Sequence, residues 1–218
     1  MPTSVNDLAQ RIEFTLFAPH ARRADIEALC AEAREKSYRA VCVNGSRVEL
    51  ARTLLEDSPV QVVALVGFPL GSGASDTKRY ETEIAVEDGA HEIDFVINLG
   101  ALRDGDTKFV LREMRDIAEA ADERPVKAVF DGHLITREEK ILLCQFAVDS
   151  GIQYVCPALD VYSIGVDIQD IALLRETLGK DFGIKATGAI SSGEQALKLI
   201  EAGATRIGAL PGTDLLSS

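Results

Sequence analysis

Eight short runs rich in β-branched and other apolar residues alternate with longer amphipathic runs, and this alternation restricts the fold more than any other feature. The apolar runs predict strands at residues 12–16, 40–43, 61–66, 92–98, 126–131, 153–156, 183–187 and 205–209. Between them, apolar residues recur three or four positions apart, which is typical of helices that bury one face. Strands that alternate with helices pair in parallel through right-handed crossovers.

Eight such units in 218 residues fit a closed α/β barrel better than an open doubly wound sheet. A doubly wound sheet usually has a glycine-rich phosphate turn after its first strand, whereas here residues 17–20 read FAPH. The chain shows no linker or break in composition, so we expect one (β/α)₈ TIM barrel domain over residues 1–218. A barrel places its chemistry at the C-terminal ends of the strands and in the loops that follow them.

The charge balance argues against two classes of partner. Asp and Glu number 35 against 23 Lys and Arg, which gives a net charge of −12 with His neutral. Nucleic acids and anionic membranes both require a basic face, so we expect neither as a partner. No apolar run reaches the roughly 18 residues of a transmembrane helix, and the N-terminal residues lack the pattern of a secretory signal. The four cysteines have no paired spacing, and we expect a reduced, cytoplasmic protein.

Four stretches together resemble the deoxyribose-phosphate aldolase family, and the similarity extends from about residue 14 to residue 212. They read VCVN at 41–44, GFPLG at 67–71, EIDFVINLGAL at 92–102 and EAGATRIG at 201–208. Members of that family are class I aldolases. In them a lysine near the end of strand six forms a Schiff base with the aldehyde, assisted by an aspartate on strand four and a second lysine on strand seven. The resemblance implies carbon–carbon lyase or related carbonyl chemistry on a small-molecule substrate, and a homodimer.

Two of these three family positions match. Asp94 falls on the aspartate and Lys185 on the second lysine, but Cys156 stands at the position of the Schiff-base lysine. A cysteine cannot form an imine, so the resemblance implies a divergent member whose mechanism differs at residue 156. Near the start of the chain, residues 13–15 (EFT) replace the family's aspartate, histidine and threonine.

The loops that hold phosphate in the family also differ. The loop after strand seven reads GAIS at 188–191, with Ser191 in place of an arginine, and the loop after strand eight reads GALPG at 208–212. A phosphate at a helix N-terminus is held by backbone N–H groups, hydroxyls and cations, and Pro211 has no N–H to donate. We therefore expect a small polar substrate without phosphate.

Four side chains are candidate catalytic residues: Asp94, Lys185, Cys156 and His133. Lys185 shares a strand face with Thr187, so it points into the barrel, where a lysine must be paired. It is ion-paired with Asp94 or Asp131, binds a neutral or carboxylate group of the substrate, or is a relocated Schiff-base lysine. Because a cysteine replaces the neighbouring lysine, the pKa of Lys185 should rise.

Cys156 has two possible roles. It is a nucleophile if a neighbour such as His133 lowers the pKa of its thiol, or it is a small buried side chain. His133 alone could equally be a solvated loop residue. Lys127 lies at the N-terminal end of its strand, which favours a structural role.

Seven further residues at strand ends and loops are predicted to contact the substrate: Asn44, Asp131, Thr187, Gly188, Ser191, Gly208 and Gly212. Asp160 and Tyr162, in the loop after strand six, are additional candidates. The sequence shows neither metal-ligand spacing nor a nucleotide-binding loop, so we expect no metal and no cofactor. Three functions remain open: an aldolase-like lyase, a ligand-binding or regulatory protein without turnover, and a cysteine-dependent enzyme that uses Cys156.

Overall fold

Eight parallel strands close into a barrel in chain order, and this confirms the predicted (β/α)₈ fold. The structure, a computed structural model, describes residues 5–159 and 165–216. The strands are β1 (Ile12–Leu16), β2 (Ala40–Asn44), β3 (Gln61–Val66), β4 (Glu92–Val96), β5 (Val126–Val129), β6 (Tyr154–Cys156), β7 (Gly183–Ala186) and β8 (Arg206–Ala209). β1 pairs with both β2 and β8, which completes the ring.

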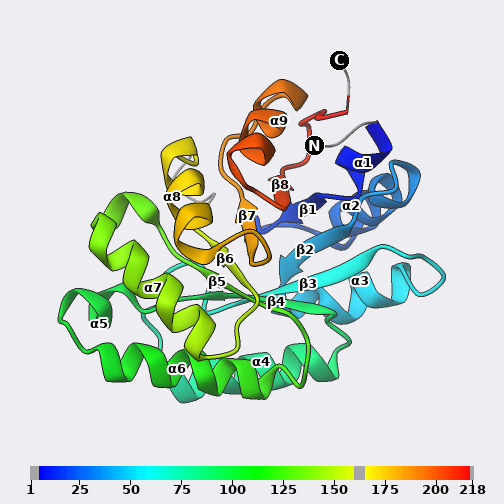
Figure 1. The fold of residues 1–218 in the computed structure, drawn as a ribbon. Helices are drawn as coiled ribbons and strands as arrows, with labels where there is room; N and C mark the ends of the chain where they lie inside the picture. The colour runs from blue at the N-terminus through cyan, green and yellow to red at the C-terminus, as the bar shows by residue number, and fades with distance from the viewer. Residues whose placement is uncertain (1–4, 160–164, 217–218) are drawn as a thin grey trace.

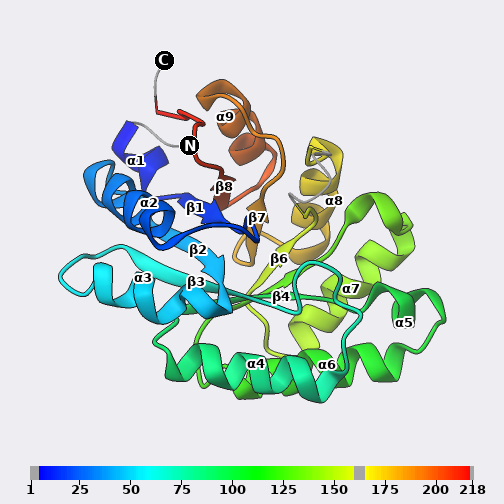
Figure 2. The same cartoon turned by 180° about the vertical axis from the view of Figure 1, so that it is seen from behind.

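Helices surround the barrel on its outside, as Figures 1 and 2 show from opposite sides. They are α1 (Val5–Ala9), α2 (Arg23–Glu35), α3 (Val48–Leu54), α4 (Ser75–Glu87), α5 (Leu99–Arg103), α6 (Thr107–Ala120), α7 (Arg137–Asp149), α8 (Ile168–Leu178) and α9 (Gly193–Ala202). Two short 3₁₀ helices, η1 (Gly45–Arg47) and η2 (Gly132–Leu134), follow β2 and β5. Among the described residues, no helix is both long enough and apolar enough to cross a membrane.

Local sequence signals determine two of the helix ends. The Thr136 hydroxyl accepts a hydrogen bond from the Glu139 N–H, and the Glu139 carboxylate accepts one from the Thr136 N–H, which forms the capping box of α7. α9 ends at Gly203, whose φ of 126° lies in the region that favours glycine. Local sequence chemistry thus sets these helix ends.

Two predicted strands run two residues past their observed ends, and a helix cap follows each of them. β4 stops at Val96 because Asn98 caps α5, with its side chain accepting the Ala101 N–H at 3.1 Å. β5 stops at Val129 because Asp131 caps η2, with its carboxylate accepting the His133 N–H at 2.9 Å. A residue whose side chain caps a helix lies at the start of that helix, so the preceding strand has ended before it.

The strands separate two regions of the interior. On β4, Ile93 and Phe95 belong to the large apolar core between strands and helices. Glu92 and Asp94 alternate with them and therefore face the inside of the barrel. The barrel interior thus contains a layer of buried charges as well as apolar side chains.

Candidate active site

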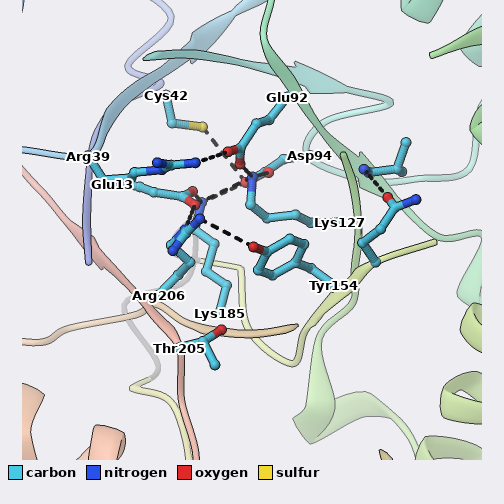
Figure 3. Close-up of polar contacts among 12 residues, drawn as sticks. Glu13, Arg39, Cys42, Glu92, Asp94, Lys127, Tyr154, Lys185, Thr205 and Arg206 are labelled. Atoms are coloured by element: carbon cyan, nitrogen blue, oxygen red, sulfur yellow. Dashed lines mark hydrogen bonds and ion pairs between the residues drawn. The ribbon is translucent and has the colours of Figure 1, made fainter. Parts of the chain in front are cut away.

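Five charged side chains meet at the centre of the barrel, as Figure 3 shows. The Lys127 Nζ lies 2.6 Å from Glu92, 2.9 Å from Asp94 and 3.4 Å from Glu13. The Lys185 Nζ lies 2.6 Å from both Asp94 and Glu13. All five are at most 3% exposed. Asp94 joins the two lysines, with one carboxylate oxygen on each.

Two longer ion pairs surround these five side chains toward the N-terminal ends of the strands. The guanidinium of Arg39 lies 3.5 Å from Glu92, and that of Arg206 lies 3.6 Å from Glu13. Arg206 also donates a hydrogen bond to the hydroxyl of Tyr154 at 3.2 Å (Figure 3). These contacts close the charged layer on the side away from the barrel mouth.

The charged layer fixes the protonation of its members. Burial alone would raise the pKa of Asp94, but the ammonium groups of Lys127 and Lys185 lower it. Burial alone would lower the pKa of Lys185, but Asp94 and Glu13 raise it well above the ordinary value. The rise expected from the sequence is therefore found. At neutral pH Asp94 is a carboxylate and Lys185 an ammonium.

A small cavity of about 30 Å³ lies above the charged layer, at the C-terminal ends of the strands. That volume holds about two waters. Asp94, Lys185 and Thr187 contribute polar groups to its wall, whereas most of the lining is apolar. The lining residues are Thr15, Phe17, Cys42, Leu65, Phe68, Asp94, Val129, Cys156, Ala158, Leu159, Lys185 and Thr187. The cavity is suited to a small molecule with one polar end.

Cys156 lines this cavity but is held as a thiol. It is 1% exposed, and its Sγ donates to the Ala158 carbonyl at 3.5 Å. Burial raises the pKa of Cys156 to about 12, and this outweighs the opposite effect of Lys185. Only the thiolate is a good nucleophile, so the environment of Cys156 opposes nucleophilic chemistry.

His133 and Asp131 do not meet the partners considered for them. The His133 ring is exposed, with its Nε2 lying 3.1 Å from the Gly165 carbonyl, and it is not among the described residues that line the cavity. Asp131 caps η2, and the carboxylates that hold Lys185 are Asp94 and Glu13. Of the two pairs considered for Lys185, the structure shows the one with Asp94.

The predicted binding residues are dispersed. Thr187 lines the cavity, and its side chain packs where a Cβ on Gly208 would lie. Asn44 donates to the Phe17 carbonyl at 3.0 Å and lines a separate surface groove beside α4. Gly212, like Ser191, is exposed in its loop. Asp160 and Tyr162 lie outside the described residues.

The loop after β7 uses its own side chains to cap α9. Ser192 accepts the Gln195 N–H at 3.2 Å, and the Ser191 N–H donates to the Gln195 side chain at 3.1 Å. In the same loop Gly188 has a φ of 104°, and Ala189 has a φ of 49°, a region that costs a non-glycine residue energy. Backbone donors that could hold an anion are thus partly occupied from within the chain.

Sequence reasoning missed the part that Glu13 plays at the centre. Lys127 was predicted to be structural; it pairs in register with Asp94 and binds its carboxylate, and it is not among the described residues that line the cavity. Glu13 alternates with residues of the outer core on β1, and an inward carboxylate on a barrel strand requires a cationic partner. That alternation was the available signal.

Comparison with known proteins identifies the class to which this barrel and its buried lysine–aspartate site belong. The model of the DeoC/LacD family aldolases matches residues 8–141. Deoxyribose-phosphate aldolase 1 of Bacillus licheniformis is 43% identical over 210 residues, which cover 96% of this chain and 94% of the relative. A deoxyribose-phosphate aldolase of Clostridium botulinum is 43% identical over 209 residues, covering 96% and 99%.

Solved structures agree with this class. The deoxyribose phosphate aldolase from Aeropyrum pernix, described as tetrameric, superposes with a TM-score of 0.88 at 30% identity and covers 94% of this chain and 88% of that one. An aldolase named QR15 gives a TM-score of 0.89 at 29% identity, covering 93% and 90%. These proteins are aldolase-like lyases built on the same barrel. The chain belongs to the DeoC/LacD family of aldolases.

Proposed function

We propose that this protein is a carbon–carbon lyase that activates a small, unphosphorylated carbonyl compound through the ammonium group of Lys185, without an imine at residue 156. The observation that carries the proposal is the position of Lys185. It lines the cavity, and its Nζ is held at 2.6 Å by the carboxylates of Asp94 and Glu13. The Nζ donates a hydrogen bond to Asp94 and is ion-paired with Glu13. An ammonium group carries three N–H donors, so Lys185 can also donate to a ligand oxygen.

The geometry supports cleavage of a β-hydroxy carbonyl compound by electrostatic stabilisation. When the bond between the α and β carbons breaks, its electron pair moves onto the carbonyl oxygen as an enolate. A buried ammonium that donates to this oxygen stabilises the developing charge. Asp94, in the same cavity, accepts the hydroxyl proton and returns it to the enolate carbon. Because the pKa of Asp94 is lowered, Asp94 is a weak base and we expect slow turnover.

Two other mechanisms have less support from the site. Imine formation requires a free amine, whereas residue 156 offers none and Lys185 is ion-paired with two carboxylates. A cysteine mechanism requires a thiolate, whereas burial raises the pKa of Cys156 to about 12. The protonation of both groups favours the ammonium mechanism.

The proposed substrates are short β-hydroxyaldehydes. A cavity of about 30 Å³ with Phe17, Leu65, Phe68 and Leu159 in its wall takes up only the carbonyl end of such a molecule. The partly occupied donors at the start of α9 support a substrate without phosphate.

The test is aldehyde release from short β-hydroxyaldehydes by the wild type, by Lys185→Met and by the surface control Lys198→Met. We expect slow release by the wild type and the control, and none by Lys185→Met. Borohydride added during turnover should not inactivate the wild type. Inactivation with an adduct on Lys185 would overturn the ammonium mechanism in favour of an imine.

A second candidate is a ligand-binding protein without turnover, and the double ion pair on Lys185 favours it because the same contacts would also serve stability alone. In that case short carbonyl compounds raise the melting temperature by mass action, yet no aldehyde is released.

We further propose that the chain acts in the cytoplasm as one domain and forms a homodimer. Sedimentation at micromolar concentration tests the oligomeric state.

A further inference from the structure

We infer that Glu13 is the positioning residue that keeps Lys185 an ammonium group, so that neutralising Glu13 converts Lys185 into an amine able to form an imine. Glu13 is completely buried on β1, and its Oε2 lies 2.6 Å from the Lys185 Nζ (Figure 3). It is not among the described residues that line the cavity. Glu13 therefore acts on a ligand through the lysines that it contacts, and the shorter of these contacts is to Lys185.

The three buried carboxylates of the charged layer differ in what they hold. Glu92 contacts Lys127 and Arg39. Asp94 contacts both lysines, with its Oδ1 2.9 Å from the Lys127 Nζ and its Oδ2 2.6 Å from the Lys185 Nζ. Glu13 gives its shortest contact, at 2.6 Å, to Lys185, while its other oxygen lies 3.4 Å from Lys127. Glu13 is thus the carboxylate that holds Lys185 from outside the cavity.

The charges around Lys185 show what would remain if the Glu13 carboxylate were neutralised. The groups that face it are the carboxylates of Glu13 on β1 and Asp94 on β4, the thiols of Cys42 on β2 and Cys156 on β6, and the ammonium of Lys127 on β5. Arg206 on β8 reaches Glu13 at 3.6 Å. Without the Glu13 charge, two buried lysines share Asp94.

Burial and repulsion from Lys127 then both favour the neutral amine of Lys185. Each unit by which the pKa of Lys185 falls makes the amine tenfold more abundant below that pKa. Such an amine attacks the carbonyl carbon of an aldehyde and forms a C–N bond. The carbinolamine then loses water to give the imine. Cyanoborohydride delivers a hydride to the imine carbon, which leaves a stable secondary amine on Lys185.

The experiment compares the wild type, Glu13→Gln and Glu92→Gln, each treated with acetaldehyde and cyanoborohydride over a range of pH. Glu92→Gln is the matched control because it neutralises an equally buried carboxylate whose partners are Lys127 and Arg39. Peptide mass spectrometry measures the rate of alkylation at Lys185, and near-ultraviolet circular dichroism verifies folding.

We expect Lys185 in Glu13→Gln to be alkylated at least tenfold faster than in the wild type at the same pH, with its reactivity midpoint moved to lower pH. Glu92→Gln should resemble the wild type. Glu13→Asp keeps the negative charge but moves it one methylene away from Lys185. The rate of Lys185 alkylation in Glu13→Asp should therefore lie between the rates in the wild type and in Glu13→Gln. If Glu13→Gln does not fold, the comparison of Glu13→Asp with the wild type is the test.

Equal rates of Lys185 alkylation in the wild type and in a folded Glu13 variant would overturn the inference. It would also be overturned if Glu92→Gln accelerated Lys185 alkylation as much as Glu13→Gln does. The inference rests on the proposed ammonium mechanism, but the two fail differently. Rapid alkylation of Lys185 in the wild type at neutral pH contradicts the proposed function. Uniformly slow alkylation in every folded variant contradicts only the role of Glu13.

Discussion

The substitution Lys78→Met should be among the most destabilising single changes in this protein, because it breaks a buried ion pair outside the charged layer. Lys78 on α4 is 1% exposed, and its Nζ lies 2.6 Å from Glu113 on α6, which is 0% exposed. The same ammonium donates to the carbonyls of Gly71 at 2.7 Å and Val96 at 3.2 Å. One side chain thus joins α4, α6, the end of β4 and the loop that carries Phe68 into the cavity wall.

The expected cost follows from the burial of both partners. Removing one member of a buried pair costs about 3–5 kcal/mol because the remaining charge is uncompensated. The two carbonyls also lose a charged donor, which adds to the loss. Burial already raises the pKa of Glu113, so in the variant this group takes up a proton and limits the loss. We therefore expect a loss of about 3–5 kcal/mol.

Urea unfolding followed by circular dichroism measures the change in the free energy of unfolding. The matched control is Arg79→Met on the same helix, whose pair with Glu83 spans 3.2 Å at 49% and 41% exposure. A surface pair of this kind contributes about 0–1 kcal/mol. A Lys78→Met protein within about 1 kcal/mol of the wild type would refute the reasoning from burial.

Three further predictions follow from the site. Burial alone would raise the pKa of Asp94, but the larger effect of Lys127 and Lys185 leaves this pKa below its ordinary value. The Asp94 carboxylate therefore stabilises the fold fully above about pH 4, and this contribution is lost on acidification. In urea titrations the difference in the free energy of unfolding between the wild type and Asp94→Asn should shrink from pH 6 to pH 3. Native Cys156 should resist iodoacetamide at pH 8 and react only after unfolding, because burial raises the pKa of its thiol to about 12; rapid native labelling read by peptide mass would contradict this. Inorganic phosphate and deoxyribose 5-phosphate should hardly raise the melting temperature, because the Ser191 and Gln195 N–H groups at the start of α9 are already hydrogen-bonded within the chain and Ser191 offers no cation. A micromolar dissociation constant for either compound would disprove this.

The sequence predicted the barrel, because eight alternations of strand and helix allow few other arrangements. It predicted the bounds of β1 and β3 correctly and overran β4 and β5, where Asn98 and Asp131 turn to cap helices. A capping residue at the end of an apolar run is hard to distinguish from one more strand residue.

The candidate site was predicted in part. Strand alternation placed Lys185 inside the barrel, and its pairing with Asp94 was one of the alternatives considered. The contact with Glu13 depends on how β1, β4 and β7 face one another across the barrel, which the order of residues along one strand does not specify. For the same reason the contact of Lys127 with Asp94 was not predicted from the sequence.

The proposed mechanism requires Lys185 to be a buried ammonium group, and ¹⁵N NMR of lysine-labelled protein measures the protonation state of its Nζ. The Nζ resonance of Lys185, assigned by its loss in Lys185→Arg, is followed from neutral to alkaline pH. We predict that it keeps the chemical shift of an ammonium beyond the ordinary lysine pKa of about 10.4, because Asp94 and Glu13 raise its pKa. A shift to that of a neutral amine near pH 7–8 would contradict the account and favour an imine on Lys185.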